Sequence, residues 1–196
     1  MINQGSKKRD LSVWVEGTIV AAMGMVLTLI PANIGFFDLS LGLVPLALYS
    51  LRRGLGPGMV SGFIWGLLAI VSGGAMKYFL SVPQIIFEYP FAFAFGGFGG
   101  IVAKKLQAGI VSNNSKSVIT MIVFGGSLAA LARFFWHFWA GVAVWGSYAP
   151  ENMSPYVYSL IINGTSGVAN AIYVVGVLLI LYGIRPQLFV PTSSRI

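Results

Sequence analysis

Residues 133–145, Arg-Phe-Phe-Trp-His-Phe-Trp-Ala-Gly-Val-Ala-Val-Trp, place the only histidine of the chain and an arginine inside an apolar run long enough to cross a bilayer. Ionisable side chains at membrane depth are costly, so they mark candidate functional sites. In a helix, residues four positions apart lie on one face. Here that face carries Arg133, His137, Gly141 and Trp145. The stretch therefore predicts a membrane helix with a polar, functional side.

The composition indicates an integral membrane protein. Of the 196 residues, 57% are hydrophobic, only 9% are charged, and 25 are glycines, which let membrane helices approach closely. The basic residues are spread between apolar runs, which favours membrane topology and excludes a nucleic-acid-binding patch. Because the chain has no cysteine and one histidine, we expect no metal site built by the protein.

Apolar runs separated by turn residues predict an all-α integral membrane protein, in which residues 1–196 form a single domain of six transmembrane helices. The expected helices are 11–30, 39–51, 58–72, 83–103, 117–145 and 156–184, with a polar loop at 104–116. The second and third helices are short for a membrane span. The first apolar run could also be a secretory signal, but it lacks a convincing cleavage site, so we expect a retained helix.

The positive-inside rule gives the orientation of these helices. With both termini cytoplasmic, the tails 1–10 and 185–196 and two connections carry nearly all basic residues, whereas Asp38 and Glu151 lie outside. The basic residues on the cytoplasmic side are Lys7, Lys8, Arg9, Arg52, Arg53, Lys104, Lys105, Lys116, Arg185 and Arg195. Lys77 and Arg133 are the exceptions, and the latter is expected within the membrane.

Glu88 is a second ionisable residue in an apolar setting, and its carboxylate needs a partner. The partner is either Arg133, in an ion pair without ligand, or His137, or a ligand. A ligand is favoured by aromatic residues expected at the same outer level, although such residues also form anchoring belts at membrane interfaces. These aromatic residues are Phe36, Phe37, Tyr78, Tyr89, Trp145, Tyr148, Tyr156 and Tyr158. Together they suit a flat, cationic heteroaromatic ligand.

Two further sets of residues have both a structural and a functional interpretation. Asn163, Ser166 and Asn170 share one face of the last helix and either join helices or contact the ligand. We expect Asn163 to contact ligand and Asn170 to be structural. The small residues of the first helix either pack internally or dock another membrane subunit. They are Gly17, Thr18, Ala21 and Ala22.

Five segments, in their order and spacing, resemble a known family. They are Ser50-Leu-Arg-Arg-Gly54, Gly62-Phe-Ile-Trp-Gly66, Phe87-Glu-Tyr89, Phe134-Phe-x-His-Phe-x-Ala-Gly141 with Trp145, and Tyr158-Ser-Leu-x-x-Asn-Gly-x-Ser-Gly167. The family is that of the thiamine-specific substrate-binding subunits of bacterial energy-coupling factor vitamin transporters. The resemblance runs through most of the chain.

The resemblance implies a thiamine site. In it, Glu88 would bind the aminopyrimidine ring, and polar contacts would come from His137, Tyr158 and Asn163. The aromatic wall would consist of Tyr78, Tyr89 and Trp145, with room left by Gly141. The chain departs from the family pattern at Arg133, where a lysine is expected, and at Phe36 and Phe37, where a tryptophan is expected.

The resemblance also implies partners, namely a transmembrane coupling subunit and two cytoplasmic ATPase subunits that use the ATP. The chain itself would need no cofactor, perform no catalysis, and cross the plasma membrane of a bacterium several times. Two alternatives remain open. The ligand could be another vitamin or a thiamine precursor, or the chain could be a stand-alone secondary transporter with Glu88, His137 and Arg133 as a proton or ion relay.

Overall fold

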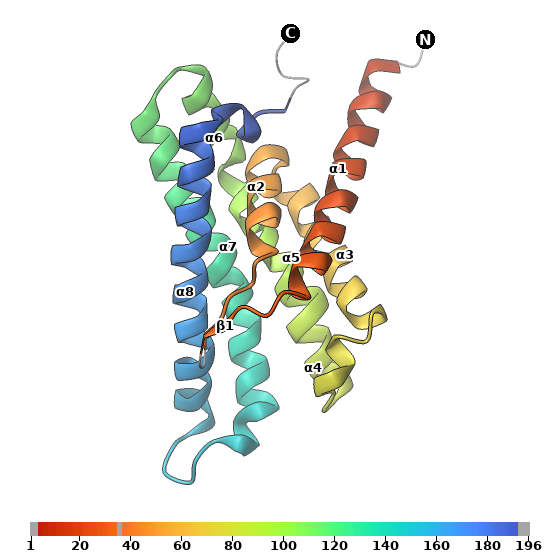
Figure 1. Ribbon diagram of the computed structural model, residues 1–196, viewed down its shortest axis with the longest axis vertical. Helices are drawn as coiled ribbons and strands as arrows, with labels where there is room; N and C mark the ends of the chain where they lie inside the picture. The colour runs from red at the N-terminus through yellow and green to blue at the C-terminus, as the bar shows by residue number, and fades with distance from the viewer. Residues whose placement is uncertain (1–3, 35–36, 192–196) are drawn as a thin grey trace.

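A computed structural model describes residues 4–34 and 37–191 and shows a bundle that is almost entirely helical (Figure 1). Its separate helices are α1 (Gln4–Thr28), α2 (Leu43–Arg53), α3 (Leu55–Val71), α7 (Ser115–Ala143) and α8 (Pro155–Ile184). Between α3 and α7 the chain forms one composite helix of α4 (Val82–Ile86), η2 (Phe87–Phe91), α5 (Ala92–Phe95), η3 (Gly96–Val102) and α6 (Ala103–Val111). Short 3-10 turns are η1 (Ala75–Tyr78), η4 (Trp145–Tyr148) and η5 (Pro186–Phe189).

Among the described residues, four segments are long and apolar enough to cross a membrane. They are Leu11–Thr28, Val82–Val111, Ser115–Ala143 and Pro155–Ile184. The prediction of an all-α fold with apolar spans is confirmed. A feature that was not predicted is a pair of two-residue strands, β1 (Asn33–Ile34) and β2 (Phe37–Asp38), which run antiparallel in the connection between α1 and α2. Strand β2 lies against α8.

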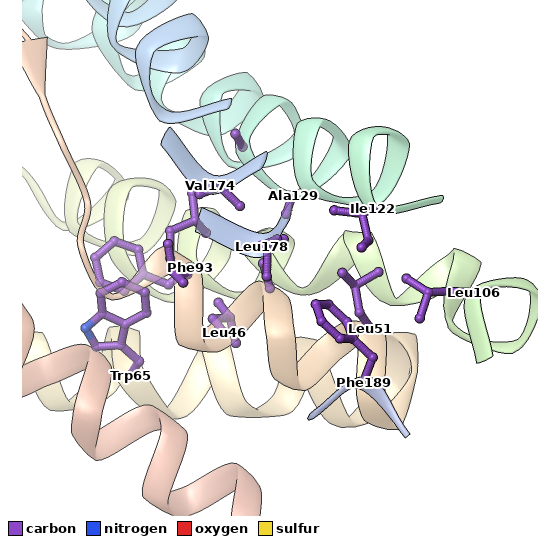
Figure 2. Packing of buried hydrophobic residues seen from close by; sticks show 14 of the residues in the cluster. Leu46, Leu51, Trp65, Phe93, Leu106, Ile122, Ala129, Val174, Leu178 and Phe189 are labelled. Atoms are coloured by element: carbon purple, nitrogen blue, oxygen red, sulfur yellow. The ribbon is translucent and has the colours of Figure 1, made fainter. Parts of the chain in front are cut away.

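Helix α2 is short for a membrane span, and the other helices of the bundle surround it. It has 11 residues, and Leu43, Leu46, Ala47 and Leu51 are buried. Figure 2 shows Leu46 and Leu51 in the middle of the apolar core, where side chains from the composite helix, α7 and α8 meet them. The core is therefore built around α2, and the helices around it form the outer surface of the bundle.

The predicted polar loop at 104–116 is wrong, because most of it is helix α6. Lys104 and Lys105 are exposed, whereas Leu106 is buried and Gly109 packs against Val118 of α7. The segment is thus an amphipathic helix end, and its lysines do not interrupt it. The true connection is only Ser112–Asn114, where the Asn114 side chain accepts a hydrogen bond from the Ser117 N–H and caps α7.

Glycines bring α3 into backbone contact with the composite helix. Gly58, Gly62 and Gly66 lie four residues apart on one face of α3. A Cβ atom on Gly62 would overlap the carbonyl oxygen of Phe93, and one on Gly66 would lie 2.6 Å from the carbonyl oxygen of Tyr89. Glycine is therefore required along this interface, since neither backbone carbonyl can move aside cheaply.

The start of α1, the end of α2, α6 and η5 lie at one end of the bundle, which we call the basic end (Figure 1). Glu16 of α1 forms ion pairs with Arg52 and Arg53 of α2, at 2.7 and 2.5 Å. Arg52 also donates hydrogen bonds to backbone carbonyls of the η5 segment. Phe189 in this segment is fully buried, so part of the expected tail 185–196 packs on the bundle.

Candidate functional site

A cavity of about 160 Å³ lies between α7 and α8 and is closed on one side by the start of α2. Its walls are formed by Leu43, Ala130, Arg133, Phe134, His137, Ile162, Asn163, Ser166, Gly167 and Asn170. Three predicted site residues, Arg133, His137 and Asn163, are among them. The cavity thus holds a cation, an imidazole and amides inside an otherwise apolar bundle, which is the costly arrangement that marks function in membrane proteins.

The facing stripes of α7 and α8 bring these residues together. On α7, Arg133, His137 and Gly141 lie one turn apart, as predicted. On α8, Asn163 and Asn170 lie two turns apart on the facing side. Gly141 allows the approach, because a Cβ atom there would overlap the Ser159 hydroxyl and lie 2.6 Å from the Asn163 amide nitrogen.

Hydrogen bonds fix the amides beside the cavity. The Asn163 amide donates to the Ser159 hydroxyl at 3.1 Å, and that hydroxyl donates to the Phe138 carbonyl at 2.7 Å. Asn170 accepts from the Ser40 N–H at 2.9 Å and donates to the Ser166 carbonyl at 2.8 Å. Asn170 therefore ties the start of α2 to α8, in agreement with the structural role expected for it, and it also lines the cavity.

Arg133 packs on aromatic rings. Its guanidinium carbon lies 4.5 Å from the centre of the Phe93 ring and 5.7 Å from that of Trp65. Such cation–π contacts stabilise a positive charge where water is scarce. Arg133 was one of three partners that the sequence left open for Glu88, beside His137 and a ligand, and the hydrogen bonds of the Glu88 carboxylate described below come from other residues.

Glu88 forms a second cluster, which we call the Glu88 cluster and which consists of Glu88, Gln84 and Trp145. Glu88 lies in η2, a π-helical turn that contains Pro90, and such turns occur frequently at functional sites. Its Oε1 accepts from the Trp145 indole N–H and its Oε2 accepts from the Gln84 amide, both at 2.6 Å. The carboxylate is thus held by one donor from its own composite helix and one from η4.

Trp145 reaches this cluster by a route that the sequence did not predict. The expected helix 117–145 ends at Ala143, and Trp145 begins the 3-10 turn η4. The regular stripe therefore ends at Gly141. Gln84 belongs to the Glu88 cluster and was not predicted, although its position four residues before Glu88 in an apolar segment was a usable signal.

The remaining predicted ligand residues are placed less centrally. Tyr89 is half-buried and lies edge-on to Phe93, 5.7 Å between ring centres, so Phe93 contacts both Tyr89 and Arg133. Tyr158 is half-buried in the first turn of α8 and is not among the residues that line the cavity. The backbone of Tyr78 belongs to η1, its side chain is outside the described part of the structure, and Phe36 lies outside the described residues.

The small residues of α1 divide between two sides of the helix. Gly17 and Ala21 are buried within the bundle, where Gly17 faces the Tyr49 hydroxyl. Thr18 and Ala22 are exposed. Of the predicted docking residues, only these last two present a surface to a partner.

A helical bundle with apolar spans and a polar cavity at membrane depth defines a ligand-handling membrane protein of the transporter class. The comparison with known families agrees and is specific. The chain belongs to the thiamine transporter protein family, whose model matches residues 14–190. The family is one of transporters and not of enzymes, and the resemblance to thiamine transport proteins drawn from the sequence is confirmed.

Individual relatives cover almost the whole chain. The thiamine transporter ThiT of Lacticaseibacillus paracasei is 36% identical over 193 residues, which are 95% of this chain and 94% of the relative. The thiamine transporter ThiT of Bacillus subtilis is 28% identical, with coverages of 93% and 96%. A solved structure of ThiT from Listeria monocytogenes matches with a TM-score of 0.88 at 35% identity, covering 93% of this chain and all of that one.

Proposed function

We propose that the chain is the thiamine-binding subunit of an ATP-driven importer of the energy-coupling factor type in a bacterial plasma membrane. One observation carries this proposal: a half-buried carboxylate held by two hydrogen bonds, next to a helix stripe that opens into a polar cavity, in a member of a thiamine transporter family. A carboxylate at this depth gives a cationic heterocycle a strong partner.

In this proposal the ligand contacts both the cavity between α7 and α8 and the Glu88 cluster. A cavity of about 150 Å³ holds one aromatic ring, so two-ring thiamine must extend beyond the cavity toward another group. We assign the aminopyrimidine to Glu88, with Trp145, Tyr89, Tyr78 and Phe36 as aromatic neighbours. We assign the hydroxyethyl end to a second, donor-rich group of residues. These are Arg133, His137, Asn163 and Tyr158, with Gly141 leaving room beside them.

Binding of thiamine to the purified protein tests this assignment. Glu88→Gln keeps the shape of the side chain but removes its charge, and a lost charged hydrogen bond weakens binding by about tenfold or more. Glu151→Gln, in the exposed loop before α8, is the matched control and should bind as the unchanged protein does. Calorimetric titration with thiamine gives both affinities. Unaltered affinity in Glu88→Gln would contradict the site.

The importer part of the proposal concerns partners. We propose a transmembrane coupling subunit and two ATPase subunits, with Thr18 and Ala22 on the exposed side of α1 at the contact. The chain crosses the membrane six times, with both termini and the basic end in the cytoplasm. Thiamine uptake into liposomes by this chain alone, driven by a proton gradient, would contradict the proposal and favour a secondary transporter.

A further inference from the structure

Gln84 is fully buried, and both its backbone N–H and the two ends of its side-chain amide have hydrogen-bond partners. Its backbone N–H donates to the Ser81 hydroxyl oxygen at 3.3 Å, and its Oε1 accepts from the Leu80 N–H at 3.0 Å. Its Nε2 donates to Oε2 of Glu88 at 2.6 Å. Burying an amide in an apolar helix costs free energy unless the amide is hydrogen-bonded. The hydrogen bonds of Gln84 therefore call for a functional explanation.

The bond to Leu80 fixes which way the Gln84 amide faces. A backbone N–H can only donate, so the amide oxygen must face Leu80 and the amide nitrogen must face Glu88. With the amide flipped, two donors would meet at Leu80 and two oxygens would meet at Glu88. Gln84 is therefore an obligate donor to Oε2 of Glu88.

The other carboxylate oxygen of Glu88 is held in the same way. The Trp145 indole N–H has no acceptor capacity, and it donates to Oε1 at 2.6 Å. A proton on either oxygen of Glu88 would face one of these donors instead of an acceptor. Hydrogen bonds to the charged form favour that form, so each of the two donors favours the carboxylate over the protonated acid.

We infer that Gln84 is a specificity-determining residue, which keeps Glu88 an acceptor so that the site takes ring N–H and amino groups and rejects a ring carbonyl at the same place. This inference rests on the proposed function, with the aminopyrimidine at Glu88. A carboxylate repels a carbonyl oxygen of a ligand, whereas a protonated acid could donate to it. Without Gln84, the discrimination between the two ring types should weaken.

The test compares thiamine with oxythiamine, in which a carbonyl replaces the ring amino group. Gln84→Met keeps a side chain of similar length and volume but has no donor. Calorimetric titration of each purified protein with each ligand gives the ratio of the two affinities. We expect the unchanged protein to prefer thiamine, and the preference to fall by about tenfold in Gln84→Met. A merely structural loss would weaken both ligands and leave the ratio unchanged.

Gln107→Met is the matched control. The Gln107 amide donates to the Leu51 and Arg52 carbonyls at the basic end, away from Glu88, so its loss should leave the ratio unaltered. If Gln84→Met does not fold, Trp145→Phe removes the other donor and keeps an aromatic ring, and the ratio must fall there. An unchanged ratio in the folded variant overturns the inference and leaves the proposed function standing. Failure of the unchanged protein to bind thiamine overturns both.

Discussion

At the residue scale, Gly141 sets the distance between α7 and α8 beside the cavity. The Ser159 hydroxyl that faces Gly141 has two hydrogen-bond partners, the Phe138 carbonyl and the Asn163 amide. A methyl group on residue 141 would overlap the hydroxyl and crowd the amide, so both bonds would have to shift. The amide of Asn163 is the part of this network that faces the proposed ligand.

Gly141→Ala should therefore weaken thiamine binding by about tenfold and lower the midpoint of thermal unfolding, since overpacking typically costs about 1–3 kcal/mol. Gly176→Ala is the control, because a Cβ atom at this exposed position of α8 meets nothing within 4 Å. Adding Ser159→Ala to Gly141→Ala removes the nearest obstacle and should restore part of the stability. Thermal unfolding in detergent and calorimetric titration check these outcomes. Full affinity in Gly141→Ala would show that the site tolerates a wider separation.

The sequence draws attention to charged candidate residues more readily than to neutral ones. Arg133, His137 and Glu88 were identified because an ionisable group in an apolar run needs an explanation wherever its side chain points. Gln84 was missed because an uncharged amide near a helix end can equally face the headgroup region. Its shared contact with Glu88 depends on the π-helical turn and the η4 turn, which bring Gln84 and Trp145 to the same carboxylate, and neither turn leaves a periodic signal.

At the element scale, α3 and the composite helix share an interface with no side chains between the two backbones at its closest points. Gly62 faces the Phe93 carbonyl, and Gly66 faces the Tyr89 carbonyl next to Glu88. The position of the Glu88 turn therefore depends on glycines in a different helix. Because backbone atoms are the obstacle, a substitution there cannot be relieved by a rotamer change.

Gly62→Ala is expected to lower the thermal unfolding midpoint, with a loss of stability of about 1–3 kcal/mol or more. Gly56→Ala in the exposed first turn of the same helix should be neutral or stabilising by up to about 1 kcal/mol, because a Cβ atom there meets nothing within 4 Å. The same glycine-to-alanine change in one helix thus has opposite expected signs. The unfolding midpoints of Gly62→Ala and Gly56→Ala, measured in the same detergent, test this expectation. Equal midpoints for the two variants would contradict the close contact at Gly62.

Element boundaries were predicted unevenly. The long spans near 11–30, 117–145 and 156–184 were found because continuous apolarity is a strong signal. Helix α6 was mistaken for a loop, because its two lysines lower the mean hydropathy of so short a segment and only one of its faces is buried. The β1–β2 pairing was not predicted, because two-residue strands have too few positions to show alternation.

At the scale of the whole molecule, the chain has no cysteine, which makes its proposed topology directly testable. Lys105→Cys and Glu151→Cys each introduce one exposed thiol, near opposite ends of the bundle. In intact cells, a membrane-impermeant maleimide should label Glu151→Cys, and should label Lys105→Cys only after the membrane is permeabilised. The reverse pattern would invert the proposed orientation, and labelling of both thiols in intact cells would contradict six crossings.

The global arrangement was the most predictable property, since basic residues alone grouped the helix ends that the structure brings to the basic end. What could not be predicted is how those ends are held together. Glu16 of α1 forms ion pairs with two arginines of α2. Arg52 also donates to carbonyls of the η5 segment, and these bonds join residues more than a hundred positions apart. The charge pattern predicts at which end of the bundle a residue lies, but not which residue it contacts there.

The glycine interface between α3 and the composite helix also limits how the protein can move. Helices that touch through their backbones cannot slide or tilt against each other without breaking the contact, and this contact extends from Gly58 to Gly66. The interior of the bundle therefore has no shear plane between α3 and the Glu88 turn. Any displacement of Glu88 along the bundle would therefore carry α3 and the composite helix together as one rigid unit.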